Sequence, residues 1–248
     1  MAHRIPFRHR AHEVSRLEAF SDVIFGFAIS LLVVSLEAPK SYAQLMEMMH
    51  GFVPFAICFL IFIDLWHEHH TFFKRYALQD NVVLALNTLL LFVILFYVYP
   101  LKYVFTMFIS GLTGHRTEAL TTVQATNIFT IYGLGFAAVF WTIAAMYYHA
   151  YRRREALALN ELEVIETRES IWDSLLGGMF GVISAAIAHT PWPGVAGMIY
   201  FLLFIPKTLV PSYFGDKRKK AEERMLAARD SAPEAPGPSA PSNRPQHA

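Results

Sequence analysis

Residues 16–39 read RLEAFSDVIFGFAISLLVVSLEAP, and this stretch decides the fold because it joins a polar head directly to a long apolar run. No charged residue occurs from Val23 to Leu36. With its flanks, the run supplies roughly the 20 residues that cross a hydrocarbon core of about 30 Å. The stretch therefore predicts a transmembrane helix with a carboxylate, Asp22, at its mouth.

Helical periodicity gives this stretch two distinct sides. At about 100° per residue, one side carries Phe27, Ser30, Leu31 and Val34. The opposite side carries Asp22, Ile29, Val33 and Leu36. The Ser30 hydroxyl lies among large apolar groups, which suits either packing between membrane helices or a pore narrowed by apolar rings. Small hydroxylated residues are enriched at membrane helix contacts, so packing is the commoner use.

The composition is that of a membrane protein. Of 248 residues, 54% are hydrophobic and only 17% are charged. The net charge is +1, and the basic clusters lie beside hydrophobic stretches, where they act as topology signals. We therefore expect a lipid bilayer as partner and no nucleic acid. The single cysteine, Cys58, excludes an intrachain disulfide.

Hydropathy along the chain predicts an all-α integral membrane protein with six transmembrane helices. The predicted spans are residues 16–39, 51–66, 81–102, 122–149, 171–189 and 195–214. We interpret residues 1–15 as a basic arm, residues 16–214 as the membrane domain, and residues 215–248 as a basic, then Pro/Ser/Ala-rich, disordered tail. A turn at residues 190–194 separates the last two spans. Glycines in the fifth span predict close helix packing: Gly177, Gly178 and Gly181.

The distribution of basic residues predicts the topology. One side of the membrane receives Arg4, Arg8, Arg10, Arg16, Lys74, Arg75, Arg152, Arg153, Arg154, Arg168 and the run Lys217–Lys220. The other side receives only Lys40, Lys102 and Arg116. Because basic residues are retained in the cytoplasm, we expect a multi-pass protein of the cell membrane with both termini cytoplasmic.

Two motifs resemble a known family. The first predicted helix begins with R-x-x-x-F-S-D, formed by Arg16, Phe20, Ser21 and Asp22. The second ends with W-x-x-H-H-x-x-F, which contains Trp66, His69 and His70, and the third contains Asn87. Together these residues resemble the transmembrane protein 175 family, potassium channels of prokaryotes and of animal endosomes and lysosomes. The motifs cover the first three spans, whereas the last three match by hydropathy and order.

The resemblance implies a six-helix subunit without a re-entrant pore loop, assembled as a homotetramer. The first helix of each subunit would line a central pore for potassium ions, with Phe27, Ser30 and Val34, next to Leu31, forming an apolar constriction. The chain departs from the family at Phe27, where relatives generally have Ile or Leu. The resemblance also implies a structural cluster in which Arg16, Ser21 and Asp22 bond with Trp66 and His70 of the second helix.

Other polar motifs have plain structural interpretations. The run His67-Glu68-His69-His70 is not HExxH, and adjacent helix positions point in different directions, so we predict a hydrogen-bonded cuff at the membrane boundary and no metal site. We expect Asp64 to contact Lys74 or water, although an ion pathway is an alternative. No catalytic set, phosphate loop or cofactor motif occurs, so we predict that the protein is not an enzyme. A TVGYG-like filter is also absent, so potassium selectivity should be weak to moderate.

The sequence predicts a passive potassium channel and leaves two rival functions open. A proton-coupled secondary transporter would use Asp22, Asp64 and the histidines as a relay, but the two halves of the chain show no inverted repeat. A nonconducting structural membrane protein is the second rival, because four phenyl rings from Phe27 would narrow the axis of a tetramer.

Overall fold

The computed structural model describes residues 6–11, 13–34, 40–113 and 120–230, and over these ranges it contains helices and no strand. The all-helical class predicted from the sequence is confirmed. The elements in chain order are α1 (Arg16–Val34), α2 (Tyr42–His50), α3 (Phe52–Tyr76), α4 (Asn81–Thr113), α5 (Thr122–Arg152), α6 (Glu161–Ala188), the 3-10 helix η1 (Pro193–Leu203) and α7 (Phe204–Asp230).

Four of the described helices are long and apolar enough to cross a membrane: α3, α4, α5 and α6. These helices correspond to the second to fifth predicted spans. In contrast, α1 is shorter, at 19 residues, and its first seven residues include Arg16, Glu18 and Asp22. The predicted sixth span corresponds to η1 and the first half of α7.

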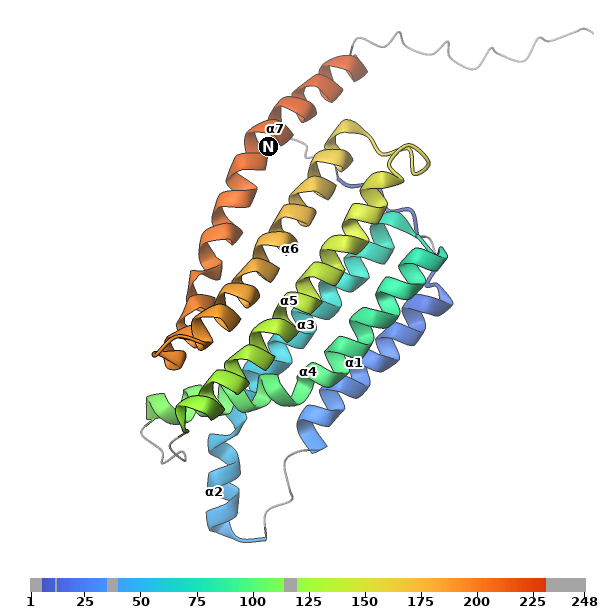
Figure 1. Ribbon diagram of the computed structural model, residues 1–248. Helices are drawn as coiled ribbons and strands as arrows, with labels where there is room; N and C mark the ends of the chain where they lie inside the picture. Colours follow the sequence, from blue (N-terminus) through green and yellow to red (C-terminus); the bar gives the residue numbers. More distant parts are fainter. Residues whose placement is uncertain (1–5, 12, 35–39, 114–119, 231–248) are drawn as a thin grey trace, which may run out of the picture.

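The long helices run side by side as an elongated bundle (Figure 1). At one edge, α1 packs against α3 and α4, while α4 also packs against α5. The pair α5 and α6 makes the most extensive contact, and α7 runs along α6 at the opposite edge. The short helix α2 projects beyond the end of the bundle. This order places α1 on the outside of the subunit.

Glycines bring α5 and α6 into backbone contact. A Cβ atom built on Gly133 would lie 2.4 Å from the carbonyl oxygen of Gly181, and one built on Gly181 would lie 2.4 Å from that of Gly133. The ring of Trp141 packs closely on Gly178, because a Cβ atom built on this glycine would lie 2.2 Å from the ring. The close packing predicted for the glycines of the fifth span is therefore confirmed.

Three predicted boundaries differ from the structure. A capping box formed by Asn160 and Glu163 starts α6 at Glu161, so residues 161–170 belong to the same helix as the fifth predicted span, 171–189. The helix α4 continues past Pro100 to Thr113. Although α6 ends just before the predicted turn, the sixth span is not one α-helix, because Pro193, Gly194 and Gly197 are poor helix formers and leave a 3-10 segment.

The basic residues after position 214 belong to α7, which continues to Asp230. Ion pairs hold this half of the helix against α6. Arg218 Nη2 lies 2.6 Å from Glu169 Oε2, and Arg224 Nη1 lies 3.1 Å from Glu161 Oε1. The predicted Pro/Ser/Ala-rich tail, residues 231–248, lies outside the described ranges.

The N-terminal arm packs onto the bundle instead of standing free. Its Phe7 is 9% exposed and meets the ring of Tyr76 edge-on, with 5.6 Å between centroids. Arg10 Nη2 lies 2.7 Å from Glu163 Oε2, while the backbone N–H of Arg10 donates to the carbonyl oxygen of Lys74 at 3.1 Å. The arm thus ties the end of α3 to the start of α6 immediately before α1 begins.

Candidate functional site

The helix α1 has a buried face and an exposed face. The buried face, which packs on α3 and α4, consists of Ser21, Phe25, Ala28 and Leu32. The exposed face consists of Phe20, Val23, Gly26, Phe27, Ser30 and Val33. Apart from Gly26 and Ser30, the exposed face is entirely made of large apolar side chains. In a membrane protein such a face contacts either lipid or another copy of the chain.

Side chains of α3 hold α1 through polar contacts near its start. The Asp22 Oδ1 atom accepts a hydrogen bond from Trp66 Nε1 at 2.8 Å. The indole of Trp66 stacks on the ring of His70 with 5.6 Å between centroids and 16° between planes. The His70 Nδ1 atom lies 3.1 Å from Glu18 Oε1, one turn before Asp22 on α1. Both carboxylates of α1 therefore have partners on α3.

A second chain of hydrogen bonds joins α1, α3 and α4. His69 Nε2 lies 2.8 Å from Asn87 Oδ1, and since an amide oxygen only accepts, this nitrogen carries the proton. Asn87 Nδ2 donates to Ser21 Oγ at 2.9 Å, and this hydroxyl donates to the carbonyl oxygen of Leu17 at 2.8 Å. We call the residues of these two chains the polar buttress: Glu18, Ser21, Asp22, Trp66, His69, His70 and Asn87.

The structure brings together six of the eight residues expected in the signature cluster and leaves two outside. Phe20 is 59% exposed. Arg16 is also exposed, and no hydrogen bond or ion pair joins it to another residue in the described ranges. The position expected for Arg16 opposite His70 is taken by Glu18, which is only 4% exposed and which sequence reasoning missed. Its four-residue spacing before Asp22 was the available signal, because such residues share a helix face.

The predicted pore residues lie mainly on the exposed face of α1. Phe27 is 54% exposed, and Ser30 is exposed with its hydroxyl donating to the carbonyl oxygen of Gly26 at 2.9 Å. Leu31 is half-buried against the core of the subunit. Val34 ends the helix, and its side chain lies outside the described part of the structure. The stripe accessible for lining a pore is therefore centred on Phe27 and Ser30.

The four consecutive polar residues of α3 point to different surroundings. His67 is exposed, whereas Glu68 accepts a hydrogen bond from the hydroxyl of Tyr147 on α5. His69 bonds to Asn87 on α4, and His70 pairs with Glu18 on α1. Neighbouring positions on a helix diverge by about 100°, so these side chains join separate helices and do not converge on a common ligand.

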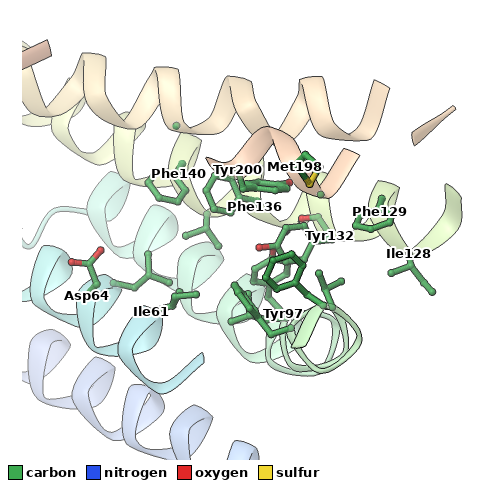
Figure 2. A pocket seen from close by; sticks show the side chains of 18 of the residues that line it. Ile61, Asp64, Tyr97, Ile128, Phe129, Tyr132, Phe136, Phe140, Met198 and Tyr200 are labelled. Atoms are coloured by element: carbon green, nitrogen blue, oxygen red, sulfur yellow. Dashed lines mark hydrogen bonds between the residues drawn. The ribbon is translucent and has the colours of Figure 1, made fainter. Parts of the chain in front are cut away.

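Asp64 does not meet Lys74. Ten residues along a helix correspond to about 15 Å, which separates the two side chains on α3. Instead, Asp64 lies at one end of an interhelical cavity (Figure 2). Asp173 of α6 and Lys207 of α7 also line this cavity.

Asp80 fixes the turn that joins the two helices supporting α1. Its Oδ1 atom caps α4 by accepting from the backbone N–H of Val83 at 3.0 Å, and its Oδ2 atom accepts from His149 Nε2 at 2.8 Å. Arg153 Nη2 lies 3.3 Å from the same oxygen. Burial alone would raise the pKa of Asp80, but the hydrogen bonds from His149 and Val83 and the charge of Arg153 hold it below its usual value.

Comparisons with known proteins agree with the motifs. A family model described as the endosomal/lysosomal potassium channel TMEM175 matches residues 16–97. A potassium channel from Marivirga tractuosa is 36% identical over 236 residues, which cover 89% of this chain and 94% of that protein. A potassium channel from Streptomyces collinus is 26% identical over 136 residues, which cover 52% of this chain and 64% of that protein.

Solved structures show the same fold. A variant of the potassium channel MtTMEM175, crystallised with a nanobody–MBP fusion, superimposes with a TM-score of 0.74 at 34% identity, over 86% of this chain and 97% of that one. A lysosomal potassium-selective channel TMEM175 homolog from Chamaesiphon minutus gives a TM-score of 0.53 at 22% identity, over 81% and 99% of the two chains. The second likeness concerns the fold alone.

Proposed function

The chain belongs to the TMEM175 family of potassium channels, and from this premise we propose that it conducts potassium ions passively through a pore lined by α1. The observation that carries the proposal is that the two faces of α1 have different contacts. Its polar groups Glu18, Ser21 and Asp22 are directed to α3 and α4, whereas Phe27 and Ser30 lie on the face that the subunit leaves uncovered.

The pore requires several copies of α1, because one helix cannot enclose an axis. We propose a homotetramer in which four exposed faces meet, with six spans per subunit, both termini cytoplasmic and the cell membrane as its location. The apolar surface around Val23 and Phe27 supports this assembly, because contact with other copies of α1 would cover it. The membrane domain comprises residues 16–214, and the second half of α7 extends it on the cytoplasmic side.

The constriction follows from the side chains on this face. Four Phe27 rings would form an apolar ring, and four Ser30 hydroxyls would lie three residues, or about 4.5 Å, further along the axis. A narrow apolar ring gates by excluding water and provides no replacement for the hydration shell of an ion. Selectivity for potassium is therefore weak to moderate, with the Ser30 hydroxyls as the only polar groups that the exposed face offers near the ring.

The polar buttress has a positioning role in this proposal. Carboxylates close to a hydrocarbon core are stabilised by partners within the bundle. Asp22 and Glu18 have such partners in Trp66 and His70, so their contribution is to hold the rotation of α1 about its axis. A fixed rotation keeps Phe27 on the side where the four subunits meet.

A flux experiment in liposomes tests the function. Purified protein is reconstituted with a potassium gradient, and fast, non-saturating potassium flux that needs no proton gradient is expected. The variant Phe27→Leu, which restores the residue type usual in the family, should raise the flux, whereas Val14→Leu, an exposed change ahead of α1, serves as the matched control. Absence of flux from both wild type and Phe27→Leu would favour a nonconducting protein.

The transporter alternative makes the opposite prediction, strict coupling of flux to protons. It would need a relay that links Asp22 through the histidines to Asp64. Asp22 accepts its hydrogen bond from the indole N–H of Trp66, a donor that does not give up its proton. Within the described ranges, no hydrogen bond connects Asp64 to His69 or His70. These contacts favour the channel.

A further inference from the structure

An apolar cavity lies between the helices of the subunit, on the side of α3 that faces away from α1. This cavity has a volume of about 490 Å³ and is bounded by α3, α4, α5, α6, η1 and α7. Five aromatic residues form much of its wall: Tyr97, Tyr132, Phe136, Phe140 and Tyr200. Figure 2 shows these rings between Asp64 at one end and Ile128 and Phe129 at the other. The volume lies within the range of about 300–1,000 Å³ that is usual for small-molecule sites.

The rings of this wall contact one another as a continuous aromatic surface. Tyr132 and Tyr200 meet edge-on with 4.9 Å between centroids, and Phe136 meets Tyr200 at 5.0 Å. Phe136 and Phe140 stack at 4.6 Å. The wall therefore offers the faces and edges of several rings to an apolar or cationic group in the cavity.

Three charged side chains surround one end of the cavity: Asp64, Asp173 and Lys207. Asp173 is in electrostatic range of the other two, yet none of the three makes a hydrogen bond or ion pair with another residue in the described part of the chain. Two carboxylates against one ammonium leave one negative charge without an opposite partner. Ionisable residues on long apolar helices such as α3 and α6 are costly, and they usually mark a functional site.

The negative end continues into a polar space. A second cavity of about 490 Å³ shares Asp64, Asp173 and Lys207 with the first and adds Glu68 and Glu169. Both arginines that line this cavity pair with glutamates: Arg218 Nη2 lies 2.6 Å from Glu169 Oε2, and Arg75 Nη2 lies 3.8 Å from Glu166 Oε2. Acidic groups are thus in excess where the apolar cavity meets the polar one.

We propose that the aromatic cavity binds an amphiphilic monocation, a molecule with one ammonium group on an apolar body. The ammonium lies between Asp64 and Asp173, where it supplies the missing positive charge through charge-assisted hydrogen bonds. The apolar body extends along Tyr132, Phe136 and Tyr200 toward Phe129. This site is independent of the pore, and it does not rest on the proposed channel function.

Two simpler occupants match only one half of the cavity. A neutral lipid chain fills the aromatic part but leaves one negative charge uncompensated. A potassium ion compensates the charge but leaves the aromatic wall without a contact. Only a molecule that joins both features satisfies the whole site.

The position of the cavity relates it to α1. Asp64 and Trp66 are separated by about 200° around α3, so the cavity and the polar buttress lie on opposite sides of the same helix. A ligand between Asp64 and Asp173 would therefore contact α3 directly behind the residue that holds Asp22.

The test compares two ligands of equal shape that differ in charge, 4-phenylbutylammonium and 4-phenylbutanol. Binding to the full chain in nanodiscs is measured by isothermal titration calorimetry, with empty nanodiscs subtracted. We expect the amine to bind about tenfold tighter than the alcohol, as one charge-assisted hydrogen bond provides. The variants Asp64→Asn and Asp173→Asn should each weaken amine binding about fivefold and leave alcohol binding unchanged, by the same arithmetic.

Asp216→Asn is the matched control, because this exposed aspartate of α7 lies outside the cavity, and it should not change either affinity. Equal binding of amine and alcohol to the wild type overturns the proposal, as does an absence of binding by both. If potassium chloride displaces the amine and choline chloride at the same ionic strength does not, the site binds a metal cation. That result would also overturn the proposal. The wild-type comparison decides the matter even if an Asp variant fails to fold.

Discussion

The two edges of the helix bundle are held by different kinds of contact. Toward α1, the contacts are directional: Asp22 to Trp66, and Ser21 to Asn87. At the opposite edge, α5 and α6 approach until the backbones of Gly133 and Gly181 meet, and hydrogen bonds from Thr126 and Trp141 of α5 to backbone carbonyl oxygens of α6 flank this contact. Hydrogen bonds fix the rotation of a helix, whereas glycine contacts fix its distance from a neighbour. On α1 the hydrogen bonds join side chains of different helices, whereas the α5–α6 contact centres on its glycines.

This contrast predicts that the α5–α6 contact is the most sensitive to added volume. In Gly181→Ala the new Cβ atom would lie 2.4 Å from the carbonyl oxygen of Gly133 and 2.8 Å from the amide nitrogen of Ala137. Backbone atoms cannot move aside, so we expect a loss of about 3 kcal/mol in the free energy of unfolding, measured by thermal denaturation in detergent.

The control is Gly111→Ala in α4, where a Cβ atom would have no neighbour within 4 Å. It should leave stability unchanged or raise it by about 0.5 kcal/mol, because alanine is the better helix former. If both variants lose the same stability, shape does not hold α5 and α6 together.

The next effect should come from the buried amide of the polar buttress. Asn87→Ala removes the partner of both His69 Nε2 and Ser21 Oγ, and all three residues are buried. Two buried groups then lose hydrogen bonds, which should cost about 2 kcal/mol. Thr88→Ala, which alters an exposed side chain bonded only to Leu84 of its own helix, should change stability by less than about 0.5 kcal/mol.

Asp22 should affect assembly as well as stability. Asp22→Ala leaves the indole N–H of Trp66 without its acceptor and frees the rotation of α1. We expect about 1.5 kcal/mol of destabilisation and less tetramer in size-exclusion chromatography with light scattering. Asp22→Asn retains an oxygen acceptor and should keep most of the tetramer. An Asp22→Ala protein that is a normally abundant tetramer would contradict the positioning role.

The smallest expected effect is a dependence on pH at the α3–α4 turn. The pKa of Asp80 is lower in the folded protein than its usual value of 3.8, so its carboxylate stabilises the fold fully above that pH. The contribution is lost as the pH falls through the lower, folded value. Asp80→Asn should therefore be less stable than wild type at pH 6 by less than about 1 kcal/mol, and the difference in thermal midpoint should shrink as the pH falls below 3.8. A constant difference would contradict the assignment.

The sequence predicts the helices of this protein better than it predicts their ends. Apolar length and basic flanks were enough to locate α3, α4, α5 and α6. The start of α6 was predictable in principle, since Asn160 and Glu163 form a capping box that was visible in the sequence. The boundary between η1 and α7 was harder to predict, because hydropathy does not distinguish a 3-10 segment from an α-helix.

Within the site, the motif residues were found by resemblance, but their pairing was not fully predicted. Periodicity places Asp22 and Glu18 on related faces of a helix, yet it does not say which group on another helix each will meet. The partners are 44 residues away for Asp22 and 52 residues away for Glu18. Such long-range pairs depend on how three helices dock, and for this reason Glu18 was missed and Arg16 was expected in its place.

The Ser21–Asn87 hydrogen bond also bears on how the protein is made. Its two residues are 66 positions apart, and at roughly 5–20 residues per second the ribosome needs about 3–13 s to pass from one to the other. Trp66 and His70, the partners of Asp22 and Glu18, are made before Asn87, so the contacts that hold α1 become possible in two steps, first with α3 and then with α4.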